Sequence, residues 1–234
     1  MDIAILYSGG KDSTLAIELA RQKGWNIKYL LSVKPTRKDC YLFHFATVEH
    51  TKELAKILNY NHILANCEVA DPVKEAKIIK DIVAKNPVEA VILGGVGLQE
   101  LQLNTIRDTL FPLGVEVFVS HKAENEIALL QEMINKKYEI YITEVAAEGL
   151  NEDYLGFKIN DKTLPNFIEL SQKYGFNVLG EGGHYNTLVV DGPIFEKRFQ
   201  ILDFKTVMDN EFSGHLEIKD YVVKEKKSKI LPLF

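Results

Sequence analysis

Six consecutive residues near the start of the chain combine glycines, hydroxyls, a cation and a carboxylate. They are Ser8, Gly9, Gly10, Lys11, Asp12 and Ser13, and they follow an apolar run at 2–7. The glycines let backbone N–H groups approach phosphate oxygens without a Cβ in the way, and the serines add hydroxyl donors. Lys11 is a compact cation, and the carboxylate of Asp12 can hold Mg²⁺ bound to phosphates. The run predicts an ATP phosphate loop of all six residues, with Lys11 and Asp12 as catalytic residues and Asp12 as the metal ligand.

Two other kinds of turn compete with this interpretation. A Walker A loop has the pattern Gly-x-x-x-x-Gly-Lys followed by Ser or Thr, whereas here Lys11 follows Gly10 inside a shorter turn. A plain strand-to-helix turn, capped by Ser or Asp, is the other alternative. The six-residue string, directly after an apolar N-terminal strand, favours the phosphate loop.

Short apolar runs alternate with amphipathic segments through the first two thirds of the chain. The runs that indicate strands are 2–7, 28–33, 62–65, 90–94 and 116–120. The segments that indicate helices between or after them are 14–23, 48–58, 72–83 and 125–134. This alternation predicts an α/β fold with an open, mostly parallel sheet and helices on both faces. Ligands bind such sheets at the carboxyl ends of the strands, where the six-residue run lies.

A second glycine cluster begins at Gly94 and Gly95, directly after the apolar run 90–94. It is predicted to let the nucleotide approach the backbone at the same edge of the sheet. Beyond about residue 120 the pattern loosens into a region punctuated by glycines. We therefore expect an ATP-binding domain over 1–120 and a smaller substrate-binding region over 121–234, packed closely because no Pro/Ser-rich linker separates them.

Composition excludes several classes of function. Net charge is -5, so nucleic acid is an unlikely partner, and the basic cluster at 224–229 is interpreted as a solvated helix end or tail. Cys40 and Cys67 stand far apart and lack the spacing of zinc, iron–sulfur or disulfide-scaffold sites. The sequence shows neither a signal peptide nor a transmembrane stretch, so we expect a cytoplasmic protein that does not contact a membrane.

The loop resembles the Ser-Gly-Gly-x-Asp-Ser signature of the N-type ATP pyrophosphatases. The resemblance implies the fold of the adenine-nucleotide α-hydrolases and a reaction in which a substrate oxygen is adenylated and pyrophosphate leaves. A nucleophile then displaces AMP. Paired cysteines for sulfur transfer are missing, and a glutaminase domain would need more chain, so free ammonia is the simpler nucleophile.

The second half is similar to the diphthine–ammonia ligase family over 145–156 and 174–193. The resemblance implies a ligase that uses ATP, Mg²⁺ and ammonium to amidate diphthine, a modified histidine of translation elongation factor 2. Within it, a carboxylate stands beside two glycines, and two hydroxyls follow at alternating strand positions. These residues, which also suit a tight turn before a strand, are predicted to bind the substrate: Glu181, Gly182, Gly183, Tyr185 and Thr187.

The chain departs from the family at several positions. The family's usual string is Glu-Gly-Gly-Glu-Tyr-Glu-Thr, whereas this chain has His184 and Asn186 in place of two glutamates. Near residue 120 the family has Pro-Leu-Trp, whereas this chain has Val119, Ser120 and His121, and His121 follows the end of a predicted strand. Two alternatives therefore stay open: a ligase for another carboxylate, such as a small-molecule acid, and an ATP-binding protein without ligase activity. Homo-oligomerisation is also left open.

Overall fold

The computed structural model describes residues 1–36, 47–68, 71–95, 100–122 and 125–226. Its N-terminal part is built on a parallel sheet of five strands in the order β3-β2-β1-β4-β5. The strands are β1 (Asp2–Leu6), β2 (Asn26–Pro35), β3 (His62–Cys67), β4 (Ala90–Leu93) and β5 (Glu116–Val119). Each of them matches a run expected from the sequence. The strand order reverses next to β1, and in open parallel sheets this switch point is where ligands bind.

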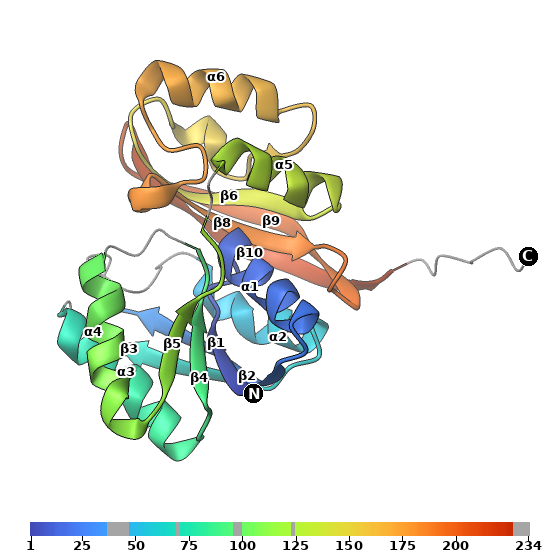
Figure 1. Cartoon of the computed structure of the whole chain (residues 1–234). Helices are drawn as coiled ribbons and strands as arrows, with labels where there is room; N and C mark the ends of the chain where they lie inside the picture. The colour runs from blue at the N-terminus through green and yellow to red at the C-terminus, as the bar shows by residue number, and fades with distance from the viewer. Residues whose placement is uncertain (37–46, 69–70, 96–99, 123–124, 227–234) are drawn as a thin grey trace, which may run out of the picture.

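Helices cover both faces of this sheet, as expected (Figure 1). The structure has α1 (Lys11–Gln22) and α2 (Thr51–Ile57) on one face, and α3 (Pro72–Lys85) and α4 (Glu100–Leu110) on the other. Side chains of β1 alternate between the two cores: Ile3 and Ile5 pack with α1 and α2, and Ala4 packs with α3 and α4. The helix expected at 48–58 is a 3-10 turn, η1 (Val48–His50), followed by α2, and α4 lies in a stretch where no helix was expected.

The C-terminal part is an antiparallel sheet with helices on one side (Figure 1). Its elements are α5 (Glu126–Asn135), β6 (Glu139–Ala146), β7 (Lys158–Ile159), α6 (Leu164–Tyr174), β8 (Tyr185–Asp191), β9 (Lys197–Asn210) and β10 (Ser213–Glu225). Three further 3-10 turns lie between described elements. Turn η2 (Phe111–Leu113) lies between α4 and β5, η3 (Glu152–Tyr154) between β6 and β7, and η4 (Glu181–Gly183) between α6 and β8. Strand β6 pairs with β7, β8 and β10, and β9 forms a long hairpin with β10.

The basic cluster at 224–229 is not a helix end where the structure describes it. Lys224 and Glu225 are the last two residues of β10 and pair with β9. The ammonium of Lys226 bonds to the carbonyl oxygen of Gly192 and to Asp191 Oδ1, at 2.6 Å in each case. None of the described helices is long and apolar enough to cross a bilayer.

One continuous hydrophobic core joins the two parts of the molecule. It contains Ile5 of β1 and Ile17 of α1 together with Leu130 of α5 and Phe167 of α6. Strand β8 also reaches the six-residue loop after β1, because the backbone N–H of Val189 donates to the carbonyl oxygen of Gly9 at 2.8 Å. The two halves therefore pack closely, as expected, and the loop from Ser8 to Ser13 is one of the places where they meet.

Candidate functional site

The loop from Ser8 to Ser13 is held by its own hydroxyl groups. The hydroxyl of Ser13 donates to the carbonyl oxygen of Gly10 at 3.1 Å and accepts from the backbone N–H of Ser8 at 3.2 Å. The backbone N–H of Gly10 donates to the Ser8 hydroxyl at 3.3 Å. Gly10 is the N-cap residue of α1 and has an extended backbone conformation, and it has no side chain that could cap the helix. The loop thus presents the N-terminal end of a twelve-residue helix, whose partial positive charge favours phosphate.

The glycines of both clusters allow the loop to pack tightly. A Cβ on Gly10 would lie 3.1 Å from the carbonyl oxygen of Thr187, and Gly9 has a φ of +82°. A Cβ on Gly94 would lie 2.4 Å from the backbone nitrogen of Ser13, so β4 can approach the loop only without a side chain at this position. Gly95 lies against Asp12 in the same way, with φ +69° and 2.9 Å between its Cβ position and the Asp12 Cβ. These glycines place the loop, and their contact with a nucleotide stays a prediction.

Lys11 and Asp12 form an ion pair at the start of α1. Lys11 Nζ lies 2.8 Å from Asp12 Oδ2, and Lys11 is 4 % exposed. The other carboxylate oxygen, Oδ1, is buried and accepts no hydrogen bond from the described residues. Burial raises the pKa of the Asp12 carboxyl, but the charge of Lys11 and the neighbouring His121 outweigh it and hold that pKa well below its usual range. Asp12 is therefore an ionised carboxylate with one oxygen left over, as a metal ligand must be.

His121 belongs to the same site. Its Nε2 lies 3.6 Å from Asp12 Oδ1, and its Nδ1 lies 2.8 Å from the hydroxyl of Ser120. The sequence had indicated this histidine only through its place after a strand. Strands β1, β4 and β5 are parallel, so their carboxyl ends lie at the same edge of the sheet. Residues 12 and 121, which follow β1 and β5, come into contact at this edge.

Two of the predicted substrate residues lie against the phosphate loop. The backbone N–H of Lys11 donates to Thr187 Oγ1 at 3.1 Å, so this hydroxyl supports the loop. Tyr185 is 2 % exposed, and its hydroxyl donates to the carbonyl oxygen of Val178 at 2.5 Å. The Tyr185 hydroxyl is thus already bonded within the core, and its contact with a substrate stays a prediction. The ring instead lies under the Lys11 ammonium, 5.7 Å from the ring centroid.

The other predicted substrate residues form the turn η4. Gly182 and Gly183 are exposed and have φ values of +79° and +81°, which favour glycine. Glu181 is half-buried. The pKa of the Tyr185 phenol is raised first by burial, then by the charge of Asp12, and then by the charge of Glu181, so Glu181 lies near this ring. The structure therefore places this turn near Tyr185, whose ring lies under Lys11, and leaves its glycines open to solvent.

The two positions at which the chain departs from the family's glutamates have local partners. His184 Nδ1 accepts from the backbone N–H of Asn177 at 2.8 Å. The side-chain amide of Asn186 donates to Glu144 Oε2 at 2.7 Å, across the pairing of β8 with β6. A carboxylate is therefore present beside position 186, but it is carried by the neighbouring strand.

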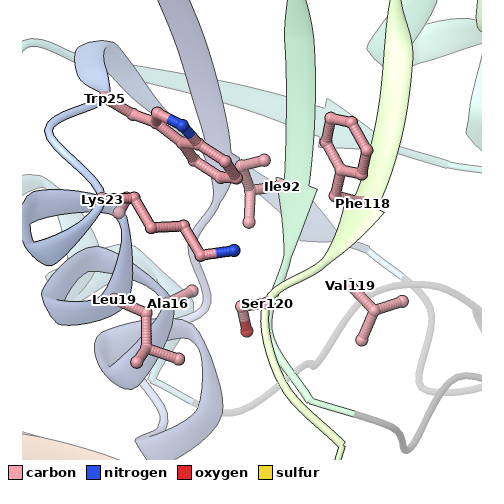
Figure 2. A pocket seen from close by; sticks show the side chains of 9 residues that line it. Ala16, Leu19, Lys23, Trp25, Ile92, Phe118, Val119 and Ser120 are labelled. Atoms are coloured by element: carbon pink, nitrogen blue, oxygen red, sulfur yellow. The ribbon is translucent and has the colours of Figure 1, made fainter. Parts of the chain in front are cut away.

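A cavity of about 160 Å³ lies between α1 and the end of β5 (Figure 2). Lys23, Trp25 and Phe118 face it, with the Lys23 ammonium 4.7 Å from the Trp25 ring centroid. Ser120, the hydrogen-bond partner of His121, also lines it. Phe118 is half-buried, packing against the core on one side and lining this cavity on the other.

Comparison with known proteins agrees with this arrangement. Residues 1–109 match the family model of the diphthamide synthase N-terminal domain, and residues 125–224 match that of the diphthamide synthase C-terminal domain. The diphthine–ammonia ligases of Homo sapiens and Bos taurus are each 30% identical to the chain over 231 residues, which cover 89% of this chain and 85% of each relative. The diphthine–ammonia ligase of Schizosaccharomyces pombe is 25% identical and is covered over 37% of its length. With both domain models matched in order, the chain belongs to the diphthamide synthase family.

Proposed function

We propose that the chain is an ATP-dependent ligase that adenylates a carboxylate and joins it to ammonia. One observation carries the proposal: an ionised Asp12 with a buried, unused oxygen stands beside Lys11 at the N-terminal end of α1. A helix end and a cation bind phosphate, and a carboxylate beside them can hold the Mg²⁺ that accompanies it. Relatives that match most of the chain are named for the same kind of reaction, the ligation of ammonia to diphthine.

The residues of the loop have separate tasks in this reaction. The N-terminal end of α1, with its partial positive charge, and the Lys11 ammonium bind and orient the triphosphate, so that the acceptor carboxylate can attack the α-phosphorus. Pyrophosphate leaves, ammonia attacks the activated carbonyl carbon, and AMP departs as the amide forms. Mg²⁺, when bound, supplies charge neutralisation on the phosphates. Asp12 would hold it, with the remaining ligands coming from phosphate and water, because no three metal-binding side chains gather among the described residues.

The acceptor that we propose is the carboxylate of diphthine on translation elongation factor 2. Support comes from the names of the relatives and from the exposed glycines of η4, Gly182 and Gly183, which a large protein substrate can reach. A second candidate is another carboxylate substrate. It is favoured by His184 and by Asn186, which is already engaged by Glu144.

The products of the reaction test this proposal. The chain is incubated with ATP, Mg²⁺, ammonium and diphthine-bearing elongation factor 2, nucleotides are separated by chromatography, and the acceptor is weighed by mass spectrometry. AMP and pyrophosphate should form in step with the amidated acceptor. AMP without amidation would point to the second candidate, another carboxylate. ADP as the product, or tight ATP binding without turnover, would overturn the ligase assignment.

Substitution of Asp12 tests the metal site within the same assay. Asp12→Asn keeps the size of the side chain and removes its charge, so turnover that requires Mg²⁺ should fall more than nucleotide binding measured without metal. Asp108→Asn is the matched control, because Asp108 is exposed on α4. Equal turnover of the Asp12→Asn variant and the unaltered chain at saturating Mg²⁺ would remove Asp12 from the mechanism.

A further inference from the structure

The two carboxylate oxygens of Asp12 have different surroundings. Lys11 Nζ approaches Oδ2 at 2.8 Å, which is hydrogen-bonding distance. Oδ1 is buried, and the nitrogen beside it is His121 Nε2 at 3.6 Å. The His121 side chain is 10 % exposed, so this contact is shielded from solvent.

The orientation of the His121 ring is set by contacts on its other side. Ser120 Oγ lies 2.8 Å from Nδ1, and the backbone N–H of Ser120 donates to the carbonyl oxygen of Leu93 at 2.8 Å. When the Ser120 hydroxyl donates to Nδ1, the ring proton is on Nε2, which faces Asp12. Gly95 also approaches Asp12 closely, because a Cβ on it would lie 3.0 Å from Asp12 Cγ, and this limits the positions that the carboxylate can take. The histidine and the carboxylate are therefore held in a defined relative orientation.

We propose that His121 is a positioning residue that holds Asp12 Oδ1 in the orientation needed to bind the metal of Mg²⁺–ATP, an inference that rests on the proposed function. At 3.6 Å the contact of Nε2 with Oδ1 is longer than a hydrogen bond and acts through electrostatic attraction. Carboxylates that bind metals are oriented by outer polar groups, and the loss of such a group typically weakens metal binding by about 10- to 100-fold. Mg²⁺ prefers oxygen ligands, so the imidazole acts on Asp12 and stays outside the coordination sphere.

Three substitutions separate this role from general support of the fold. In His121→Gln, the side-chain amide can place an N–H where Nε2 was. In His121→Asn, the shorter amide reaches only the position of Nδ1. His121→Met removes both polar groups. Binding of a non-hydrolysable ATP analogue is measured by calorimetry with Mg²⁺ and, separately, with a chelator. We expect His121→Met and His121→Asn to bind the analogue with Mg²⁺ about 10- to 100-fold more weakly, and His121→Gln to stay close to the unaltered chain. Affinity without metal should not change in any of them.

Several results would overturn the role of His121. One is a His121→Met variant that binds the analogue with Mg²⁺ as tightly as the unaltered chain. Another is an equal loss of affinity with and without metal, which would indicate that the histidine supports the loop only. A much larger loss with Ni²⁺ than with Mg²⁺ would make the imidazole a direct ligand, because Ni²⁺ favours imidazole. If the unaltered chain binds the analogue equally well with Mg²⁺ and with the chelator, the proposed function itself fails, and the inference about His121 fails with it.

Discussion

At the level of single residues, the site depends on the absence of a side chain at Gly10. The φ of Gly10 is −74°, which any residue adopts, so a larger residue would fail there for lack of space and not from backbone strain. Thr187 and Ser8 already lie within 3.4 Å of the position that a Cβ would take. A larger residue would therefore displace Thr187 or Ser8, which hold the loop that we propose binds ATP.

Gly10→Val should therefore weaken ATP binding while the flanking β1 and α1 remain folded. A loss of one charge-assisted hydrogen bond, about 1.5–3 kcal/mol, corresponds to a roughly 10- to 100-fold lower affinity. Calorimetry measures the affinity and circular dichroism the fold. Ala84→Val introduces the same branched side chain at an exposed position of α3 and should bind ATP normally. Unchanged affinity in a folded Gly10→Val protein would show that the loop is not the ATP site.

His62 makes the stability of the fold depend on pH. Burial, and then the charge of Lys52, lower the pKa of His62 from 6.5 to about 4. Its Nε2 lies 2.8 Å from the hydroxyl of Ser32, which donates to the carbonyl oxygen of Tyr7 just before the loop. Between pH 6.5 and about 4 the unfolded chain takes up a proton at this residue that the folded chain does not, so stability falls as the pH falls.

His62→Gln keeps an N–H that can reach Ser32 and removes the titration. Above pH 6.5 the difference in unfolding free energy between the unaltered chain and the variant should be constant, and it should shift in favour of the variant as the pH falls toward 4. Urea unfolding across this range measures it. A difference in unfolding free energy that does not change with pH would contradict the lowered pKa of His62 in the folded chain.

At the level of elements, α1 connects the phosphate loop to the C-terminal sheet. Its first turn carries Lys11, and its middle carries Glu18, which is 9% exposed. Glu18 accepts from the hydroxyl of Tyr138 at 2.7 Å and from the ammonium of Lys136 at 2.9 Å, just before β6 begins. Burial, and then Glu18, raise the pKa of Tyr138, so its hydroxyl stays protonated and remains a donor.

Tyr138→Phe removes this hydroxyl and leaves a buried carboxylate oxygen without that donor. Hydrogen bonds to charged groups contribute about 1.5–3 kcal/mol, so we expect a loss of that order in the free energy of unfolding, measured in urea. Tyr174→Phe, on the exposed end of α6, is the control and should change the free energy little. If both variants unfold alike, the contact between Tyr138 and Glu18 does not hold the two parts together.

At the level of the whole molecule, the phosphate loop is completed by a strand from the other end of the chain. Thr187 of β8 accepts the N–H of Lys11, and Val189 donates to the carbonyl oxygen of Gly9. The bond from Lys11 to Thr187 joins residues 176 positions apart. ATP binding and the stability of the C-terminal sheet should therefore be linked.

Thr187→Val preserves the shape of the side chain and leaves the buried N–H of Lys11 without its acceptor. An unsatisfied buried donor costs about 1–3 kcal/mol, so we expect a loss of this size in stability together with weaker ATP binding. Thr187→Ser restores the acceptor and should restore both properties. Calorimetry and urea unfolding on the same samples provide the measurement, and a variant that loses stability but binds ATP normally would disprove the linkage.

Local patterns in the sequence were sufficient for the first sheet and the loop. The five strands are short apolar runs, and the turn from β1 to α1 is defined by adjacent glycines, so neighbouring residues carry the information. The long hairpin of β9 and β10 was not expected. Much of it is only half-buried, with exposed Leu202, Phe204 and Tyr221, so its alternation is weak, and its turn near residue 211 lacks glycine.

Contacts between distant residues were decided by the tertiary structure alone. Strand order places His121 beside Asp12, and the docking of β8 gives Thr187 to the loop and turns the Tyr185 hydroxyl into the core. A periodic pattern reports which face of an element is buried, but it carries no information on which other element covers that face. The residue types of the phosphate loop follow from the sequence, whereas the partners that orient them follow from the way the two sheets pack.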